Sequence, residues 1–325
     1  MIRIGARSAA TCLLAVAALA AAIPGTGGAS GHAAAPLVDP PHAATALAGP
    51  RSVEPAAADP AAADPVLVGA GDIARCRNKT DALTADLIAA IPGHVFAAGD
   101  LAYPKGSAKD FRNCYGPSWG AFRNRTSPVV GNHEYEQPGA KPYFAYFGKR
   151  AGPSGKGWYA YNLGTWRIYV LNSNCEIVRC GSKSAQGRWL RADLAAHPHA
   201  CVAAIWHHPL FSSGFHGPIT LSRRLWRPLA AAGADIVING HDHDYERFEP
   251  QTIDGVASPS GMREFVVGTG GTSLRAFVSN AANSAARNAG THGVLKLTLS
   301  PGAYTWQFVP VEGDSWTDAG TAACT

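Results

Sequence analysis

The sequence is poor in charged residues and has no long apolar run after its N-terminal segment. Asp, Glu, Lys and Arg make up 16% of the 325 residues, and the formal net charge is +5. The basic residues are scattered, which argues against nucleic acid as the main partner. No stretch after residue 30 is long enough to cross a bilayer, so no membrane span is expected. With 46% hydrophobic residues, the chain can instead bury a large core.

The N-terminal region is expected to be a targeting segment followed by a linker. Two arginines precede an apolar run at 13–23, and small residues follow it. Because this run is too short for a membrane helix, residues 1–30 are predicted to be a secretory signal peptide. Residues 31–64 are rich in Ala and Pro, which predicts a disordered linker. The folded domain is expected at 65–325, in a secreted, extracellular protein.

Cysteine is also scarce, but its count is informative. One of the seven cysteines lies in the predicted signal peptide, and six remain. An even number in an exported chain favours disulfides, although the sequence alone does not determine their connectivity. As hypotheses we pair the two that are close in sequence and then the remaining four: Cys175–Cys180, Cys76–Cys114 and Cys201–Cys324.

Apolar runs alternate with helical patterns along residues 65–325. Helices are predicted at 80–91, 184–196 and 220–232. Thr80 is expected to cap the first helix, whose apolar face is formed by Leu83, Leu87, Ile88 and Ile91. Short apolar runs predict buried strands between the helices, and the end of the chain is β-rich, with strands expected at 263–267, 293–299 and 304–309. This order indicates an α/β sandwich.

Five of the predicted strands end in the same way, with a metal-competent side chain directly after the apolar run. The endings are Gly71-Asp72, Gly99-Asp100, Gly131-Asn132-His133, Trp206-His207-His208 and Gly240-His241-Asp242-His243. Each alone has a plainer interpretation as a polar turn. Because α/β sheets keep their ligands at the carboxyl ends of their strands, five such endings in one chain point to a shared site. Carboxylates, amides and imidazoles are what two metal ions with a bridging carboxylate require.

These motifs resemble the calcineurin-like metallophosphoesterase superfamily, and within it the purple acid phosphatases. The resemblance is carried by the five endings, by His207-His208-Pro209 and by the run from Gly240 to Arg247, so it spans most of the folded part. It implies a four-layer α/β/β/α sandwich of the metallophosphoesterase type, with residues 65–325 as the catalytic domain of a bacterial, secreted enzyme. It departs from the family at Ala74, where many members carry histidine or glycine, and the linker leaves no room for the β-sandwich domain of plant members.

The resemblance also implies which residues bind each of two metal ions. One ion is expected on Asp72, Tyr103 and His243, and the other on Asn132, His207 and His241, with Asp100 bridging the two. Purple acid phosphatases place a tyrosine three residues after the bridging aspartate, which is the position of Tyr103. A phenolate favours Fe(III), so the expected pair is Fe(III) with a divalent ion (Zn, Mn or Fe). The alternative for Tyr103 is a packed loop aromatic.

Three further histidines are candidate catalytic residues. By the resemblance, His133 touches the phosphate or the leaving group, and His216 helps to protonate the leaving group. His208 is a candidate substrate contact. For His216 the interpretation as an ordinary loop histidine stays open.

The function implied is that of a secreted dinuclear-metal phosphomonoesterase, which hydrolyses small-molecule phosphate esters by in-line attack of a metal-bound hydroxide. A phosphodiesterase or nucleotidase with the same metal site is an alternative. A second alternative, from a different class, is a non-catalytic surface protein that binds phosphate or metal. All seven predicted ligands are present, which argues against it, because a site that no longer turns over should have lost some of them. An adhesion module would account for the cysteines and leave the five strand endings unexplained. The sequence does not indicate the natural substrate, the pH optimum or the oligomeric state.

Overall fold

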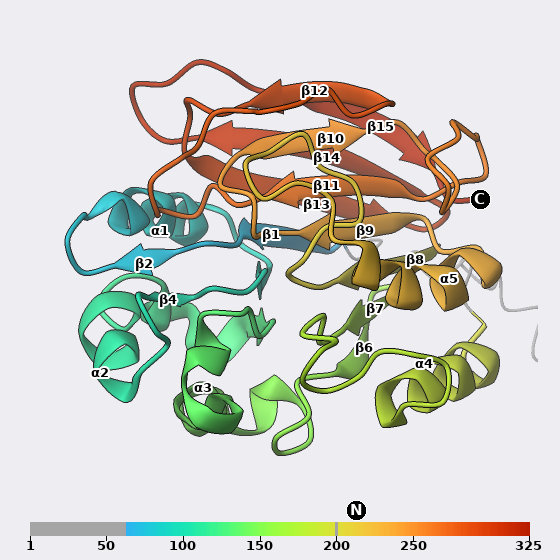
Figure 1. The fold of residues 1–325 in the computed structure, drawn as a ribbon. Coiled ribbons are helices and arrows are strands. Elements are labelled where there is room, and N and C mark those ends of the chain that lie inside the picture. The colour runs from blue at the N-terminus through green and yellow to red at the C-terminus, as the bar shows by residue number, and fades with distance from the viewer. Residues whose placement is uncertain (1–62, 199–200) are drawn as a thin grey trace, which may run out of the picture. The chain divides into compact units, whose positions relative to one another are not determined.

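The computed structural model describes residues 63–198 and 201–325, in which the strands form two large sheets and one small one (Figure 1). The order in the first sheet is β15 (Ala319–Ala323), β14 (Ala303–Pro310), β13 (Gly293–Ser300), β1 (Val66–Ala70), β3 (His94–Ala97) and β5 (Thr126–Pro128). The order in the second is β12 (Ser284–Asn288), β10 (Tyr245–Phe248), β11 (Arg263–Val267), β9 (Ile236–Asn239), β8 (Cys201–Ile205), β7 (Trp166–Val170) and β6 (Tyr159–Leu163). The small sheet pairs β2 (Ala74–Arg75) with β4 (Ala102–Tyr103).

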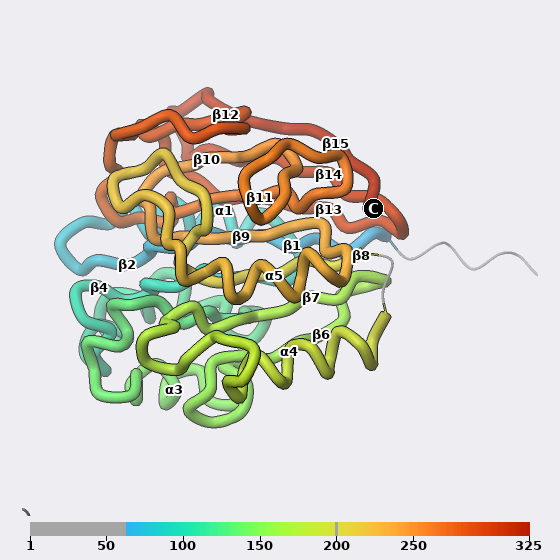
Figure 2. Tube along the Cα trace, turned by 45° about the vertical axis from the view of Figure 1, so that its right-hand side comes forward, coloured from blue at the N-terminus to red at the C-terminus, as the bar shows by residue number. Residues whose placement is uncertain are grey.

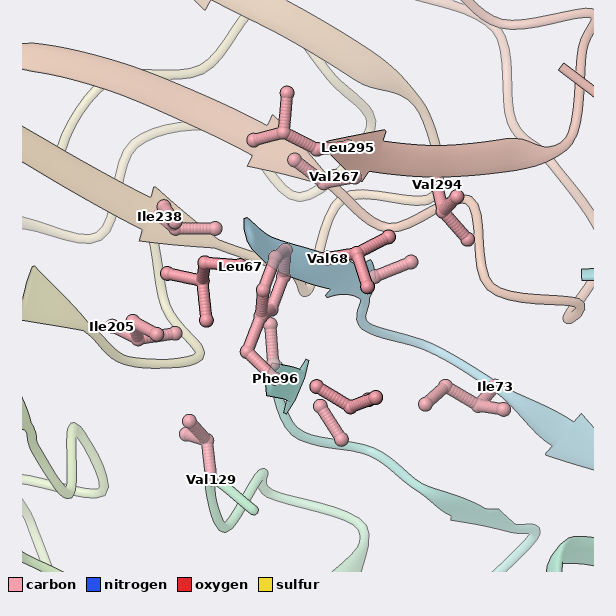
Figure 3. Packing of buried hydrophobic residues seen from close by; sticks show 14 of the residues in the cluster. Leu67, Val68, Ile73, Phe96, Val129, Ile205, Ile238, Val267, Val294 and Leu295 are labelled. Carbon is pink, nitrogen blue, oxygen red and sulfur yellow. The ribbon is translucent and has the colours of Figure 1, made fainter. Parts of the chain in front are cut away.

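The two large sheets pack face to face around the main core. Leu67 of β1 and Phe96 of β3 lie in the same buried cluster as Ile205 of β8 and Ile238 of β9 (Figure 3). Along β8 and β9 the side chains alternate, because successive residues in a strand point to opposite faces. Val237 and its outward-facing neighbours belong to a second cluster, which packs against helices.

Helices cover the outer faces of both sheets. On the second sheet, α4 (Ala185–Ala196) and α5 (Arg223–Ala231) lie side by side (Figure 2) and bury Leu190, Leu225 and Trp226 in the second cluster. On the first sheet, α1 (Thr80–Ala90) packs against β13, and the segment with the short helices α2 (Ala108–Asp110) and α3 (Lys141–Phe147) follows β4. The predicted four-layer α/β/β/α sandwich is therefore confirmed.

Strand direction explains where the predicted site residues meet. In the first sheet β1, β3 and β5 are parallel neighbours, and in the second β7, β8, β9 and β11 are parallel. The remaining strands pair antiparallel at the edges. Since parallel neighbours end at the same edge of a sheet, the loops after β1, β3, β5, β8 and β9 open at one end of the sandwich.

Most predicted elements are present, with shifted helix starts. Ser184 caps α4 by accepting a hydrogen bond from the Gly187 amide, and the third helix is a 3₁₀ turn, Thr220–Ser222, followed by α5. Thr80 is the first residue of α1, and Lys79 occupies the cap position, so the predicted cap was wrong. The strands predicted near the C-terminus are all present, and the structure adds β12 and β15. The predicted signal peptide and the linker up to residue 62 lie outside the described residues.

All three predicted disulfides are present: Cys76–Cys114, Cys175–Cys180 and Cys201–Cys324. The last joins the start of β8 in the second sheet to the residue that follows β15 in the first, across a separation of 123 residues. Cross-links over long loops restrict the unfolded chain most. None of the helices among the described residues combines the length and hydropathy that a membrane span requires.

His94, the first residue of β3, is expected to make the fold sensitive to acid. Burial, together with the charges of Arg150 and Arg125, lowers its pKa to about 4. Because the folded pKa lies below the unfolded one, the neutral ring stabilises the fold above pH 6.5, and this contribution is lost as the pH falls toward 4. His94→Gln does not titrate and can keep the bond to Ser127 Oγ, 2.8 Å away in the wild type.

Urea unfolding at pH 7 and pH 4.5 tests this expectation. The wild type should lose about 1 kcal/mol more than the variant over this interval. An identical loss in both proteins would assign the acid sensitivity to other groups.

Candidate metal centre

The site begins with backbone conformations that side chains rarely adopt. Asp72 after β1, Asp100 after β3 and His241 after β9 have φ angles of 57°, 51° and 74°, in the left-handed region. Such conformations cost on the order of 1–3 kcal/mol each and persist only where the surroundings enforce them. They turn the three side chains inward from the strand ends.

The glycines of the motifs leave room for these side chains. A Cβ at Gly131 would lie 2.1 Å from Oδ1 of Asp100, and one at Gly240 would lie 2.5 Å from Oδ2 of Asp72. Any other residue at either position would push the carboxylate away. The repeated pairing of glycine with a polar residue in the sequence is thus a packing requirement of the site.

One group of predicted ligands forms around Tyr103. Its hydroxyl donates a hydrogen bond to Oδ1 of Asp72 at 2.8 Å and lies 3.1 Å from Nε2 of His243. The same His243 nitrogen is 3.5 Å from Oδ1 of Asp72. Three side chains, from the loops after β1 and β9 and from β4, therefore present their donor atoms to one point.

A second group forms around His207. Its Nε2 lies 3.1 Å from Oδ1 of Asn132 and 3.2 Å from Oδ2 of Asp100, and its ring is 5.1 Å from that of His241. Asp100 Oδ2 also lies 3.3 Å from the Tyr103 hydroxyl. Asp100 thus stands between the two groups, at the position that a bridging ligand would occupy.

Backbone carbonyls orient two of the imidazoles. Nδ1 of His207 lies 2.8 Å from the carbonyl oxygen of Ala98, and Nδ1 of His243 lies 3.0 Å from that of Ser273. A carbonyl only accepts, so each Nδ1 carries a proton, and each Nε2 is the nitrogen that faces the carboxylates. Histidines that bind metal through one ring nitrogen commonly donate from the other nitrogen to a carbonyl in this way.

The charges of the site fit bound cations. Asp72 and Asp100 are 0% and 2% exposed, and among the described residues the ion-pair partners of both are histidines, without a lysine or arginine. Burial lowers the pKa of the His207 imidazole, but the carboxylates of Asp100 and Asp72 outweigh burial and raise that pKa to about 9. The cluster therefore attracts positive charge. Donor atoms of Asp72, Asp100 and His207 lie within 4.8 Å of one another, as do those of His207, His208 and His241.

The three candidate catalytic histidines surround this cluster. His133 Nδ1 donates to the Pro104 carbonyl, 2.6 Å away, and its Nε2 lies 3.8 Å from Oδ2 of Asp100. The His208 ring lies 4.5 Å from that of His241, and burial followed by the charge of His207 lowers the His208 pKa to about 3. The His216 ring also lies 4.5 Å from that of His241. All ten predicted site residues thus come together.

The model of one protein family, described as "Calcineurin-like phosphoesterase", matches residues 66–245, which is more than half of the chain. The chain belongs to the calcineurin-like phosphoesterase family. The matched residues begin with β1 and end at Tyr245, so they include every predicted metal ligand. The resemblance inferred from the motifs is therefore confirmed.

The chain is similar to purple acid phosphatase 15 of Arabidopsis thaliana, with 28% identity over 65% of this chain and 46% of that protein. An uncharacterized Mycobacterium tuberculosis protein is 29% identical over 45% of this chain and 35% of its own. Among solved structures, the purple acid phosphatase PPD1 of yellow lupin aligns with a TM-score of 0.65 at 19% identity, over 80% of this chain and 53% of that one. GAP50, the anchor in the inner membrane complex of Plasmodium, aligns with 0.59 at 14% identity, over 79% and 88%. The chain spans about half the length of the purple acid phosphatases it matches.

Two residues near the candidate metal centre were given no role by the sequence analysis. Glu134 belongs to the quoted Gly-Asn-His-Glu motif but was given no role, and it accepts hydrogen bonds from the amides of Asp100, Leu101 and Gly131 at 2.8–3.0 Å. Burial raises its pKa to about 8, and the charge of Asp100 adds to this. The motif itself was the signal that could have identified it.

Arg275 is the other, and no sequence pattern marks it. Its Nη1 donates to Nε2 of His216 at 2.9 Å, and its guanidinium lies 4.8 Å from the centre of the Phe215 ring. Burial lowers the pKa of His216, and Arg275 lowers it further against the opposing charge of Asp242. In this arrangement Nε2 of His216 is an acceptor, so the His216 proton is on Nδ1.

Proposed function

We propose that the chain is a secreted phosphomonoesterase with two metal ions, and that it hydrolyses phosphate esters of small molecules. One observation carries the proposal: two carboxylates, an amide and three imidazoles from five strand ends of the two large sheets, together with the phenol of Tyr103 in β4, converge on two adjoining points. Family membership and the similarity to purple acid phosphatases support the same reaction. The disulfides are compatible with secretion, which the predicted signal peptide would direct.

Asp72, Tyr103 and His243 would hold one ion, and Asn132, His207 and His241 the other, with Asp100 shared. We propose Fe(III) with a divalent ion (Zn, Mn or Fe), since a phenolate oxygen suits a trivalent ion. When bound, such a pair acidifies water to a nucleophile at neutral pH and clamps the phosphoryl oxygens.

The remaining histidines act on the substrate. His133 is held by the Pro104 carbonyl with Nε2 toward the cluster, so it is placed to bind a phosphoryl oxygen. His208 is kept neutral by burial, and it offers the phosphoryl group a second contact from the side of the group around His207. In the reaction, a water oxygen bonds to phosphorus and gives up a proton to solvent, and the bond from phosphorus to the leaving oxygen breaks. In its doubly protonated form, His216 would supply the proton that the departing alkoxide takes up, which leaves the neutral ring whose Nε2 accepts from Arg275.

The first test is hydrolysis of p-nitrophenyl phosphate beside bis(p-nitrophenyl) phosphate, with protein purified without chelator. A strong preference for the monoester is expected. A preference for the diester would replace the proposal with a phosphodiesterase or nucleotidase. No cleavage of either after Fe, Zn or Mn is added back would favour a non-catalytic binding protein.

Tyr103→Phe tests the identity of the metal. A phenolate bound to Fe(III) gives a visible charge-transfer band, so the variant is expected to lose the colour of the wild type, measured by absorbance at matched iron content. Tyr143→Phe is the control, because Tyr143 is equally buried but its hydroxyl donates to the Pro128 carbonyl. Colour that survives in Tyr103→Phe would show that Tyr103 is not an iron ligand.

His216→Gln tests the proton donor. A proton donor matters most for poor leaving groups, so kcat should fall about 100-fold for an alkyl phosphate and only a few-fold for p-nitrophenyl phosphate. The ratio of the two rates is the measurement, since it is insensitive to the amount of active protein. Equal losses for both substrates would assign His216 a positioning role.

A further inference from the structure

A pocket of about 410 Å³ opens beside the metal centre. Its lining includes His208 and two residues of the second group of predicted ligands, Asn132 and His241, so the pocket adjoins that group. If a phosphoryl group is bound there, as the proposed function requires, its ester substituent has this pocket to enter. The side chains of the pocket therefore bear on which leaving groups the site accepts.

Part of the pocket lining is apolar and is called here the apolar wall. It consists of Tyr135, Ile177, Ile219 and Leu221, and the disulfide Cys175–Cys180 closes the loop that carries Ile177. Ile177 is 58% exposed, one of the most exposed large hydrophobic side chains among the described residues. A substrate group with carbon surface would cover this wall, which favours leaving groups with an apolar body.

The only charged groups in the described lining are carboxylates. Glu136 and Glu176 stand at the pocket, and the lining contains no lysine or arginine. Glu136 is 43% exposed, with Oε1 3.1 Å from Nδ1 of His133, and Glu176 is exposed on the disulfide loop. A leaving group with its own negative charge would be repelled here, and a cationic one attracted.

The other polar side chains of the pocket are already engaged. Ser173 Oγ lies 2.8 Å from Nδ1 of His208 and accepts a hydrogen bond from the His208 amide. The Asn174 side-chain amide donates to Asn172 Oδ1 at 3.1 Å and to the Val130 carbonyl at 3.3 Å. The two glutamates are thus the groups of the lining that can select by charge, with one oxygen of Glu136 already close to His133.

We propose that this pocket selects phosphate monoesters whose leaving group is an amine-bearing alcohol or phenol with an apolar body, over esters of anionic leaving groups. The proposal rests on the proposed function and narrows its substrate class. The phosphoryl end is bound by the metal centre, the carbon skeleton lies on the wall of Ile177, and the ammonium group lies toward Glu136 and Glu176.

Three aryl phosphates that differ in one side-arm charge test the proposal: 4-(2-aminoethyl)phenyl phosphate, 4-ethylphenyl phosphate and 3-(4-phosphonooxyphenyl)propanoate. Two methylene groups insulate the phenol oxygen from the charge, so the leaving groups are matched. In low salt, kcat/KM should fall in the order ammonium, ethyl, carboxylate, by about three- to ten-fold per step. Because both glutamates are exposed, 0.5 M NaCl should reduce the differences in kcat/KM between the three substrates.

Variants locate the effect. Glu176→Gln and Glu136→Gln should each reduce the ratio of kcat/KM between the ammonium and ethyl substrates, and the double variant should bring it close to one. Glu312→Gln, which removes an exposed carboxylate outside the pocket lining, should leave the ratio unchanged. Ile177→Ala should raise KM for all three substrates without altering their order. The ratio is internal to each variant, so a general loss of activity does not affect it.

Two kinds of outcome would overturn the proposal, and they have different consequences. Hydrolysis of all three substrates at equal kcat/KM, or an order that survives the double glutamate variant, would overturn the charge selection and leave the phosphomonoesterase intact. No hydrolysis of these esters or of p-nitrophenyl phosphate, with metals added back, would overturn both.

Discussion

An Asp100→Asn variant is expected to lose at least about a thousand-fold in kcat/KM and to retain less than two metal ions per chain. Asp100 Oδ2 lies 3.2 Å from Nε2 of His207 and 3.3 Å from the Tyr103 hydroxyl, so one side chain serves both ligand groups. An amide has the same shape, but it carries no charge and only one oxygen. Metal content per chain, measured on protein dialysed against metal-free buffer, and kcat/KM for p-nitrophenyl phosphate are the two readouts.

Asp86→Asn is the matched control, because Asp86 is an exposed aspartate on α1. It should keep both metal content and activity. If Asp100→Asn kept two ions per chain with wild-type kcat/KM, the two ions would not need a shared carboxylate. Asp72 would then be the only aspartate required in the ligand set.

The parts of the fold that could be predicted are those with a local signature. Five of the predicted ligands follow apolar strands, and parallel strands end together, so five short motifs were enough to bring Asp72, Asp100, Asn132, His207 and His241 to one place. The position of Tyr103 relative to Asp100 needed only a count of three residues. The disulfides could be proposed because few cysteines were present and two of them were close in sequence.

Helix α1 shows where local pattern failed. Its apolar face was predicted to include Leu83, which is 47% exposed in the structure. Asp81 and Thr84 are buried instead: Ser118 Oγ donates to Asp81, and Thr84 Oγ1 donates to the Gly270 carbonyl at 2.6 Å. Hydrogen bonds to residues distant in sequence rotated the helix, and helical periodicity contains no information about them.

The same limit applies to the support of the metal centre. The Ala98 and Ser273 carbonyls that orient His207 and His243 are backbone atoms, which leave no trace in residue identity. Glu134 has a recognisable motif, but its role depends on the loop after β3 meeting the loop after β5, a contact formed only in the folded sheet. Its contribution can be measured directly.

Glu134→Gln is expected to weaken metal binding about 10–100-fold and to destabilise the fold by about 2–4 kcal/mol. Both carboxylate oxygens of Glu134 accept from backbone amides: Oε1 from Leu101 and, at 3.4 Å, Ala102, and Oε2 from Asp100 and Gly131. In glutamine one oxygen becomes an NH₂ group, which faces two N–H donors and cannot accept from either. The loops that carry Asp100 and Asn132 then lose their common anchor.

Glu264→Gln separates positioning from stability. Glu264 is also fully buried, and its two oxygens accept from the amides of Leu210 and Phe211 at 2.9 and 3.1 Å. Both variants should unfold at lower urea concentration, but only Glu134→Gln should need excess metal to recover activity, because its ligands are intact and merely misplaced. Asp100→Asn should not be rescued in this way, since it lacks a ligand. If metal affinity fell equally in Glu134→Gln and Glu264→Gln, the role of Glu134 would be stability alone.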